Sequence, residues 1–278
     1  MVPDPLDLQI AANRRAAVAV RGRVLAFLAA SWMGLGSWNV GDVERFVALV
    51  LPVVLAGQRS VATLTDSYLA MLAARAFGTL PEPVSIDPVL VSGAVLRNGT
   101  DPELVYRRGG AVVWDNLAKG EPLPVAVERG LARLTSIAAT DLQLAKTHTA
   151  RQVLEQQPAG REPTGYVRTL EGTSSCGFCA LASTRLYHVE ELLPIHPGCD
   201  CDVEPYYGDA ALVVDPVQLE QVHALAREFF GTSRASGVDR GSGEFDYHDF
   251  VVVHEHGELG PVLARRGDHF SGPQAPAA

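Results

Sequence analysis

The four cysteines of this 278-residue chain all lie between Cys176 and Cys201, and the rest of the sequence contains none. They form two pairs, Cys176-x2-Cys179 and Cys199-x-Cys201, and His196 lies three residues before the second pair. Thiolates from two separate turns can meet at one tetrahedral ion, and soft sulfur ligands select zinc over magnesium or calcium. The spacing therefore predicts that Zn²⁺ fastens two loops of the chain together.

Five candidate ligands compete for the four positions of such a site: Cys176, Cys179, His196, Cys199 and Cys201. Either all four cysteines bind the ion, or His196 replaces one of the closely spaced Cys199 and Cys201. A site with four protein ligands leaves no position for a catalytic water, so we expect the zinc to be structural. Cysteines without metal, or a dithiol or disulfide function, are the alternative interpretations.

The Cys-Gly-Phe-Cys stretch suggests a second class of function, a thiol-dependent hydrolase or oxidoreductase that uses Cys176 or Cys179. The residues around these cysteines depart from the papain-like nucleophile segment, and no βαβ pattern surrounds them as in thioredoxin. The sequence also has no phosphate-binding loop, dinucleotide fingerprint or H-E-x-x-H motif. His254-x-His256 is typical of a polar strand end, with a second metal site or a partner contact as the alternative.

Outside the cysteine segment the sequence favours long helices. Hydrophobic residues make up 47% of the chain and aromatic residues only 7%, which suits helices packed through small and aliphatic side chains. We expect helices at residues 6–32 and 43–77, the second kinked at Pro52, and a third that begins after Thr100 or Asp101. The strongest pattern lies in residues 124–157, where one stripe recurs at steps of three and four: Val127, Leu131, Leu134, Ala138, Leu142, Ala145, Thr149 and Val153.

The formal net charge of −9 belongs to the C-terminal part, since residues 171–278 carry six basic and seventeen acidic side chains. Such a segment repels nucleic acid. Five basic residues lie off the stripe of the 124–157 helix: Arg129, Arg133, Lys146, His148 and Arg151. We interpret them as a solvated face. A surface for a partner or for weak DNA contact across 129–151 is the alternative, which makes a nucleic-acid-binding zinc protein a third class of function.

The first residues show no basic segment followed by an apolar run, so we expect no secretory signal. In a reducing cytoplasm, clustered cysteines favour metal binding over disulfides. The longest apolar run, residues 46–57, is too short to span a bilayer. We therefore expect a buried helix there and no membrane partner.

Together these patterns predict a mainly α protein with long N-terminal helices and a small α+β zinc-binding module near the C-terminus. Short antiparallel strands around the cysteines are expected at residues 166–170 and 199–207, a further strand at 250–254, and an amphipathic helix at 215–230. We divide the chain into an N-terminal helical region (1–100), a long-helix scaffold (101–160), the zinc module (161–231), and a linker with an acidic tail (232–278).

The order of a long helix, a "YVRTLEG" strand, "CGFC" and then "LPIHPGCDCDVEP" resembles the MuF-like minor head proteins of tailed bacteriophages, also called phage head morphogenesis proteins. The resemblance covers residues 166–205 and the helices before them. Its most specific element is His196-Pro197-x-Cys199-x-Cys201 with the C-x-x-C upstream.

This resemblance implies that residues 161–231 are a MuF-like zinc module in a non-enzymatic structural protein of the virion. Such a protein assembles in the host cytoplasm and ends inside the capsid, where it assists head assembly and genome packaging or ejection. The implied partner is the phage portal protein, with the major capsid or scaffolding protein as further candidates.

Overall fold

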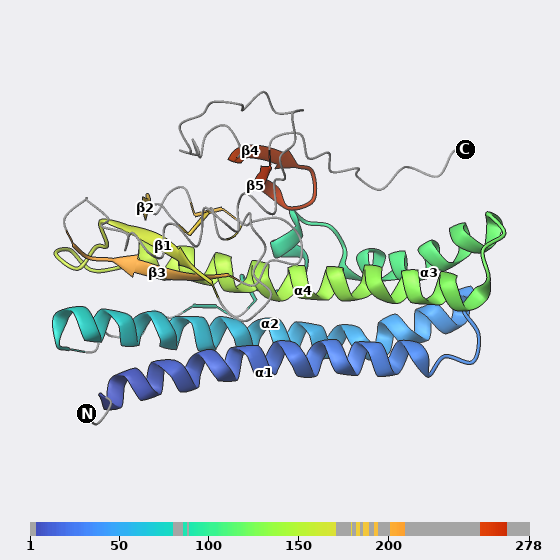
Figure 1. Ribbon diagram of the computed structural model, residues 1–278, viewed down its shortest axis with the longest axis horizontal. Coiled ribbons are helices and arrows are strands. Elements are labelled where there is room, and N and C mark those ends of the chain that lie inside the picture. Colours follow the sequence, from blue (N-terminus) through green and yellow to red (C-terminus); the bar gives the residue numbers. More distant parts are fainter. Residues whose placement is uncertain are drawn as a thin grey trace, which may run out of the picture. The chain divides into compact units, whose positions relative to one another are not determined.

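The computed structural model describes residues 4–79, 86–87, 89–170, 179, 182–183, 186–188, 192–193, 201–208 and 251–265. Figure 1 shows its elements: α1 (Pro5–Met33), α2 (Val40–Phe77), η1 (Gly93–Arg97), α3 (Pro102–Ala118), α4 (Leu123–Glu155), β1 (Gly165–Thr169), β2 (Leu186–Tyr187), β3 (Asp202–Tyr206), β4 (Val251–His256) and β5 (Gly260–Arg265). The prediction of a mainly helical protein with a few short antiparallel strands is confirmed. The chain divides into two compact units, Met1–Val153 and Leu154–Ala278.

Short polar side chains set the starts of the first three helices. Asp4, Asn39 and Asp101 cap α1, α2 and α3, and each accepts a backbone N–H from two or three residues later at 2.8 or 2.9 Å. Pro102 occupies the first helical position of α3, where its missing N–H costs nothing. Of the two caps that the sequence offers for α3, the structure therefore uses Asp101 rather than Thr100.

Helices α1 to α4 share one hydrophobic core. Figure 1 shows α1 and α2 antiparallel and side by side, as their dense contacts require. The Trp32 indole is fully buried, donates to the Val127 carbonyl at 3.1 Å and packs edge-on against Phe46 with centroids 5.1 Å apart. The predicted stripe of α4 is confirmed, since Leu131 is half-buried and the other seven members are buried.

Glycines let these helices approach closely. A Cβ built on Gly130 of α4 would lie 2.9 Å from the Gly109 carbonyl oxygen in α3, and 2.8 Å from both Trp32 and Val113. These distances are shorter than van der Waals contact. The close packing of α3 and α4 around Gly130 therefore depends on the absence of a side chain there.

Helices α1 and α2 are each long and apolar enough to cross a membrane, judged by length and composition alone. The apolar run at 46–57 belongs to a much longer helix, Val40–Phe77, which continues through Pro52. Core helices of water-soluble proteins pass the same test, and α2 supplies Phe46, Val50 and Val54 to the shared core. The expected absence of a membrane partner stays a prediction.

The C-terminal unit contains two antiparallel sheets among its described residues, one of three strands in the order β2-β1-β3 and one hairpin of β4 and β5. The strands predicted at 166–170, 199–207 and 250–254 correspond to β1, β3 and β4, each shifted at its ends. Strands β2 and β5 were not predicted. The helix predicted at 215–230 lies outside the described residues.

Candidate functional site

The structure describes two of the five predicted zinc ligands, Cys179 and Cys201. Both are buried, and the exposed fraction of each is 1%. Cys176, His196 and Cys199 lie outside the described residues. Within the described part of the chain, no group of three or more His, Cys, Asp or Glu side chains could hold a metal ion. The zinc site therefore stays a prediction.

Strand pairing brings Cys201 to the end of β1. In the antiparallel register of β1 and β3, Thr169 lies opposite Asp202 and Arg168 opposite Val203, and Cys201 directly precedes β3. Arg168 donates from Nη1 to Cys201 Sγ at 3.4 Å, within the range of a hydrogen bond to sulfur. Two parts of the sequence 33 residues apart therefore meet through a cation and a thiol.

Two tyrosines and a carbonyl surround the Arg168 side chain, which is 1% exposed. The rings of Tyr166 and Tyr187 stack with centroids 5.1 Å apart, and the guanidinium carbon lies 5.8 Å from each centroid. Nη2 donates to the Leu193 carbonyl. Tyr166 and Arg168 are two residues apart in β1, so they share one face of the strand. The guanidinium is thus held by cation–π contacts and hydrogen bonds on a rigid sheet.

The other described cysteine is linked to the same sheet through Tyr187 of β2. The Tyr187 hydroxyl donates to the Ala182 carbonyl at 2.8 Å, and the Ser183 N–H donates to the Cys179 carbonyl at 3.0 Å. Tyr187 pairs with Tyr166 of β1. Contacts to adjoining strands therefore anchor the segments of both Cys179 and Cys201. The thiol-enzyme interpretation, which uses Cys176 or Cys179, stays a prediction.

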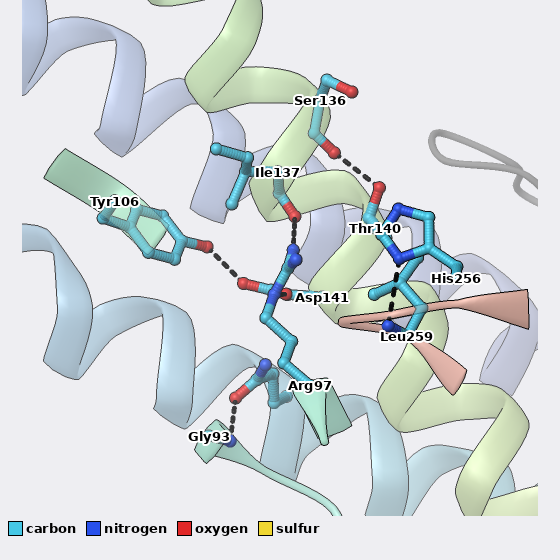
Figure 2. A network of polar contacts seen from close by, with 10 residues as sticks. Gly93, Arg97, Tyr106, Ser136, Ile137, Thr140, Asp141, His256 and Leu259 are labelled. Atoms are coloured by element: carbon cyan, nitrogen blue, oxygen red, sulfur yellow. Dashed lines mark hydrogen bonds and ion pairs between the residues drawn. The ribbon is translucent and has the colours of Figure 1, made fainter. Parts of the chain in front are cut away.

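A second polar cluster lies in the helical unit (Figure 2). Arg97 of η1 donates from Nε to Asp141 Oδ1 at 2.6 Å, and the Tyr106 hydroxyl donates to Asp141 Oδ2 at 2.7 Å. Arg97 also donates to the Ile137 carbonyl at 3.4 Å. Burial, followed by the charge and hydrogen bond of Asp141, raises the pKa of Tyr106 well above its usual value of 10.0. Since both carboxylate oxygens are occupied by the protein's own groups, we interpret the cluster as structural.

Sequence reasoning missed this cluster, although one signal was present. Asp141 belongs to an inward row of α4 at helical spacing, with Leu134, Ala138 and Ala145. An acidic residue in an otherwise apolar row indicates a buried partner. The identity of that partner could not be read from the pattern.

The five basic residues of α4 do not behave as one solvated face. Arg129, Arg133 and Arg151 are exposed as predicted, and Arg129 pairs with Glu121 at 3.0 Å. His148 is only partly exposed, and burial, followed by the nearby Arg151 charge, lowers its pKa. The predicted solvated face is therefore confirmed for Arg129, Arg133 and Arg151, whereas Lys146 and His148 are only partly exposed.

His256 organises the turn between β4 and β5. Its Nδ1 accepts the backbone N–H groups of Glu258 and Leu259, both at 3.2 Å. His254 lies two residues earlier on the same strand. The pair was interpreted as a polar strand end, and at this end His256 accepts hydrogen bonds from two backbone N–H groups of the turn.

The chain was compared with protein-family models, with curated proteins and with solved structures, and none of the three comparisons found a match.

Proposed function

We propose that this chain is a non-enzymatic minor head protein of a tailed bacteriophage. In this proposal the helical unit docks at the portal protein, with the major capsid or scaffolding protein as further partners. The C-terminal unit is a compact module fastened by zinc. The protein acts inside the capsid, in head assembly and genome packaging or ejection.

The observation that carries the proposal is the antiparallel pairing of β1 and β3. These strands hold the two sequence elements on which the resemblance rests, "YVRT" in β1 and "DVEP" after the last cysteine. The pairing joins them, and a side chain of the first contacts the last cysteine of the second. The long helix α4 precedes them in the order that the resemblance implies.

The described cysteines fit a thiolate metal site in two respects. Both are buried, as ligands of a closed structural site must be, and a cationic donor lies against Cys201 Sγ. Cys176 and Cys179 would supply two ligands, and two of His196, Cys199 and Cys201 would supply the others. When bound, zinc would cross-link the two cysteine-containing segments, and metal-binding energy would become folding energy.

Mass spectrometry of purified virions and of empty precursor heads from the encoding phage tests the assembly function. We expect the chain in both particles, in far fewer copies than the major capsid protein. Its absence from both particles would refute the proposal.

Elemental analysis of the purified protein tests the zinc module. We expect about one zinc per chain. The double variant Cys179→Ser/Cys201→Ser should lose the metal and the protection of the β1–β3 amides from hydrogen exchange. His188→Ser, at an exposed position beside β2, is the matched control and should keep both. A double variant with the melting curve of the parent would contradict the metal assignment.

A further inference from the structure

Helix α1 is apolar on all sides, although only one side of it is buried. The buried side chains recur at helical spacing: Ile10, Val20, Val24, Leu28 and Trp32. The rest of its surface carries four large apolar side chains with exposed fractions of 37–60%: Leu8, Val18, Phe27 and Met33. Figure 1 shows α1 along an outer edge of the helical unit, beside α2. Helices that are apolar all round are normally covered all round, so the uncovered surface of α1 indicates a partner.

A seven-residue repeat defines the outward face of α1. Ala12, Ala19, Ala26 and Met33 are each seven residues apart, and all four are exposed. Such a repeat aligns side chains in one seam along a helix, which is the pattern that a second, nearly aligned helix packs against. Because three of the four side chains are alanine, the axis of a partner helix can approach to about 8 Å. The repeat therefore indicates a helical partner.

Two arginines lie among the residues of this outward face. Residues 8–33 include four arginines and no acidic residue. Arg15 and Arg23 are exposed, and neither side chain has an ion pair or hydrogen bond among the residues that the structure describes. They are eight residues apart in the sequence, which corresponds to about 12 Å along the helix axis. The outward face thus presents two uncompensated positive charges about two helical turns apart.

These charges select among the possible occupants of the outward face. A second copy of the chain would bring the same arginines to the same seam, and like charges that face each other are unfavourable. Duplex DNA would pair with the arginines, but interfaces with DNA are polar, whereas this surface also exposes Phe27 and Met33. An acidic helix satisfies both features, because its apolar seam covers the alanines and its carboxylates pair with the arginines.

We propose that the outward face of α1 is the docking surface for an acidic amphipathic α-helix of a partner protein. The partner helix lies nearly aligned with α1 and covers Ala12, Ala19 and Ala26 with its own apolar seam. Two of its carboxylates, about two turns apart, pair with Arg15 and Arg23. The inference goes beyond the proposed function, because it concerns the helical unit alone and requires neither the zinc module nor a virion.

Two synthetic helical peptides supply the probe. The acidic peptide has alanine and leucine along a heptad seam and two glutamates about two turns apart, and the basic peptide has lysine in place of both glutamates. Fluorescence anisotropy measures the binding of each labelled peptide to the full chain. Arg23→Glu reverses a charge on the outward face, and Ala19→Gln places a longer, neutral side chain in its seam. Arg59→Glu, at an exposed position of α2, is the matched control.

We expect the acidic peptide to bind the parent and Arg59→Glu with equal affinity. Arg23→Glu should bind it about tenfold more weakly, because an attractive pair of charges becomes a repulsive one. The basic peptide should show the opposite preference and bind Arg23→Glu more tightly than the parent. Ala19→Gln should also weaken the binding of the acidic peptide, although it changes no charge. Circular dichroism establishes that each variant is folded.

Three results would overturn the proposal. The first is an acidic peptide that does not bind the parent, or that binds Arg23→Glu equally well. The second is a parent protein that sediments as a dimer and an Ala19→Gln variant that sediments as a monomer, which would assign the outward face to a second copy. The third is binding to phosphatidylglycerol vesicles that Arg23→Glu loses and the acidic peptide does not compete with, which would assign the face to a membrane surface. None of these results bears on the presence of the chain in virions.

Discussion

Replacement of Gly130 by alanine tests whether the close approach of α3 and α4 determines the stability of the helical unit. The new methyl group would meet three neighbours at 2.8–2.9 Å, and one of them is the backbone carbonyl of Gly109, which cannot rotate away. Another is the Trp32 ring, whose indole N–H already donates to Val127. We therefore expect α3 and α4 to separate and the packing around Trp32 to loosen.

The expected change in unfolding free energy for Gly130→Ala is the difference between two contributions. Overpacking of a tight core costs about 1–3 kcal/mol, and the contact with a backbone atom places this site near the upper end of that range. Alanine regains about 1 kcal/mol of helix propensity over glycine. The net loss of unfolding free energy is then about 2 kcal/mol, or a decrease of about 4–8 °C in Tm for a unit of this size.

Gly22 supplies a matched control in α1. A Cβ at that position meets nothing within 4 Å, so Gly22→Ala gains the helix propensity of alanine without a steric clash. We expect it to stabilise the protein by about 0.5–1 kcal/mol. The same substitution should therefore lower the unfolding free energy at position 130 and raise it at position 22. Urea denaturation followed by circular dichroism measures both values, and a Gly130→Ala variant as stable as Gly22→Ala would refute the reasoning.

Three further predictions concern buried or capping polar groups. Asp141→Asn should lower the unfolding free energy by about 3–5 kcal/mol in urea titrations, because Arg97 would keep a buried charge without its counter-ion. The double variant Arg97→Met/Asp141→Leu should lose less unfolding free energy, because it removes both charges. The folded state holds the Tyr106 proton above pH 10.0, where the unfolded state releases it, so stability should be unaffected below that pH and fall above it. Tyr106→Phe should flatten this alkaline decline in pH-dependent denaturation. His256→Ala should accelerate amide exchange in β4 and β5 by removing the acceptor for two turn N–H groups, whereas His254→Ala should leave the turn intact.

The helices could be predicted from the sequence because their signals are local. Caps at Asn39 and Asp101 and the stripe of α4 depend on residues within a few turns of each other. Strand β2 has two residues and β5 contains Pro261, so neither gives a recognisable strand pattern. Their pairing depends on tertiary partners instead.

In the candidate site too, some residues could be predicted from local sequence spacing, whereas others depend on contacts between distant segments. Spacing alone nominated Cys179 and Cys201, and the structure finds both buried. The contact of Arg168 with Cys201 depends on the register of two strands that are distant in sequence. The match of Arg97 with Asp141 likewise joins η1 to α4 across 44 residues. Periodicity indicates that Asp141 points inward, but it does not show which cationic side chain pairs with it.

The buried pair of Arg97 and Asp141 also constrains how this sequence can change over generations. Loss of either partner alone leaves an uncompensated charge inside the helical core. A chain that carries only one of the two substitutions would therefore be less stable than a chain with neither. Paired replacement by apolar residues carries no such penalty. Descendants of this chain are therefore expected to inherit both residues or neither, which would make positions 97 and 141 a covarying pair in any collection of its relatives.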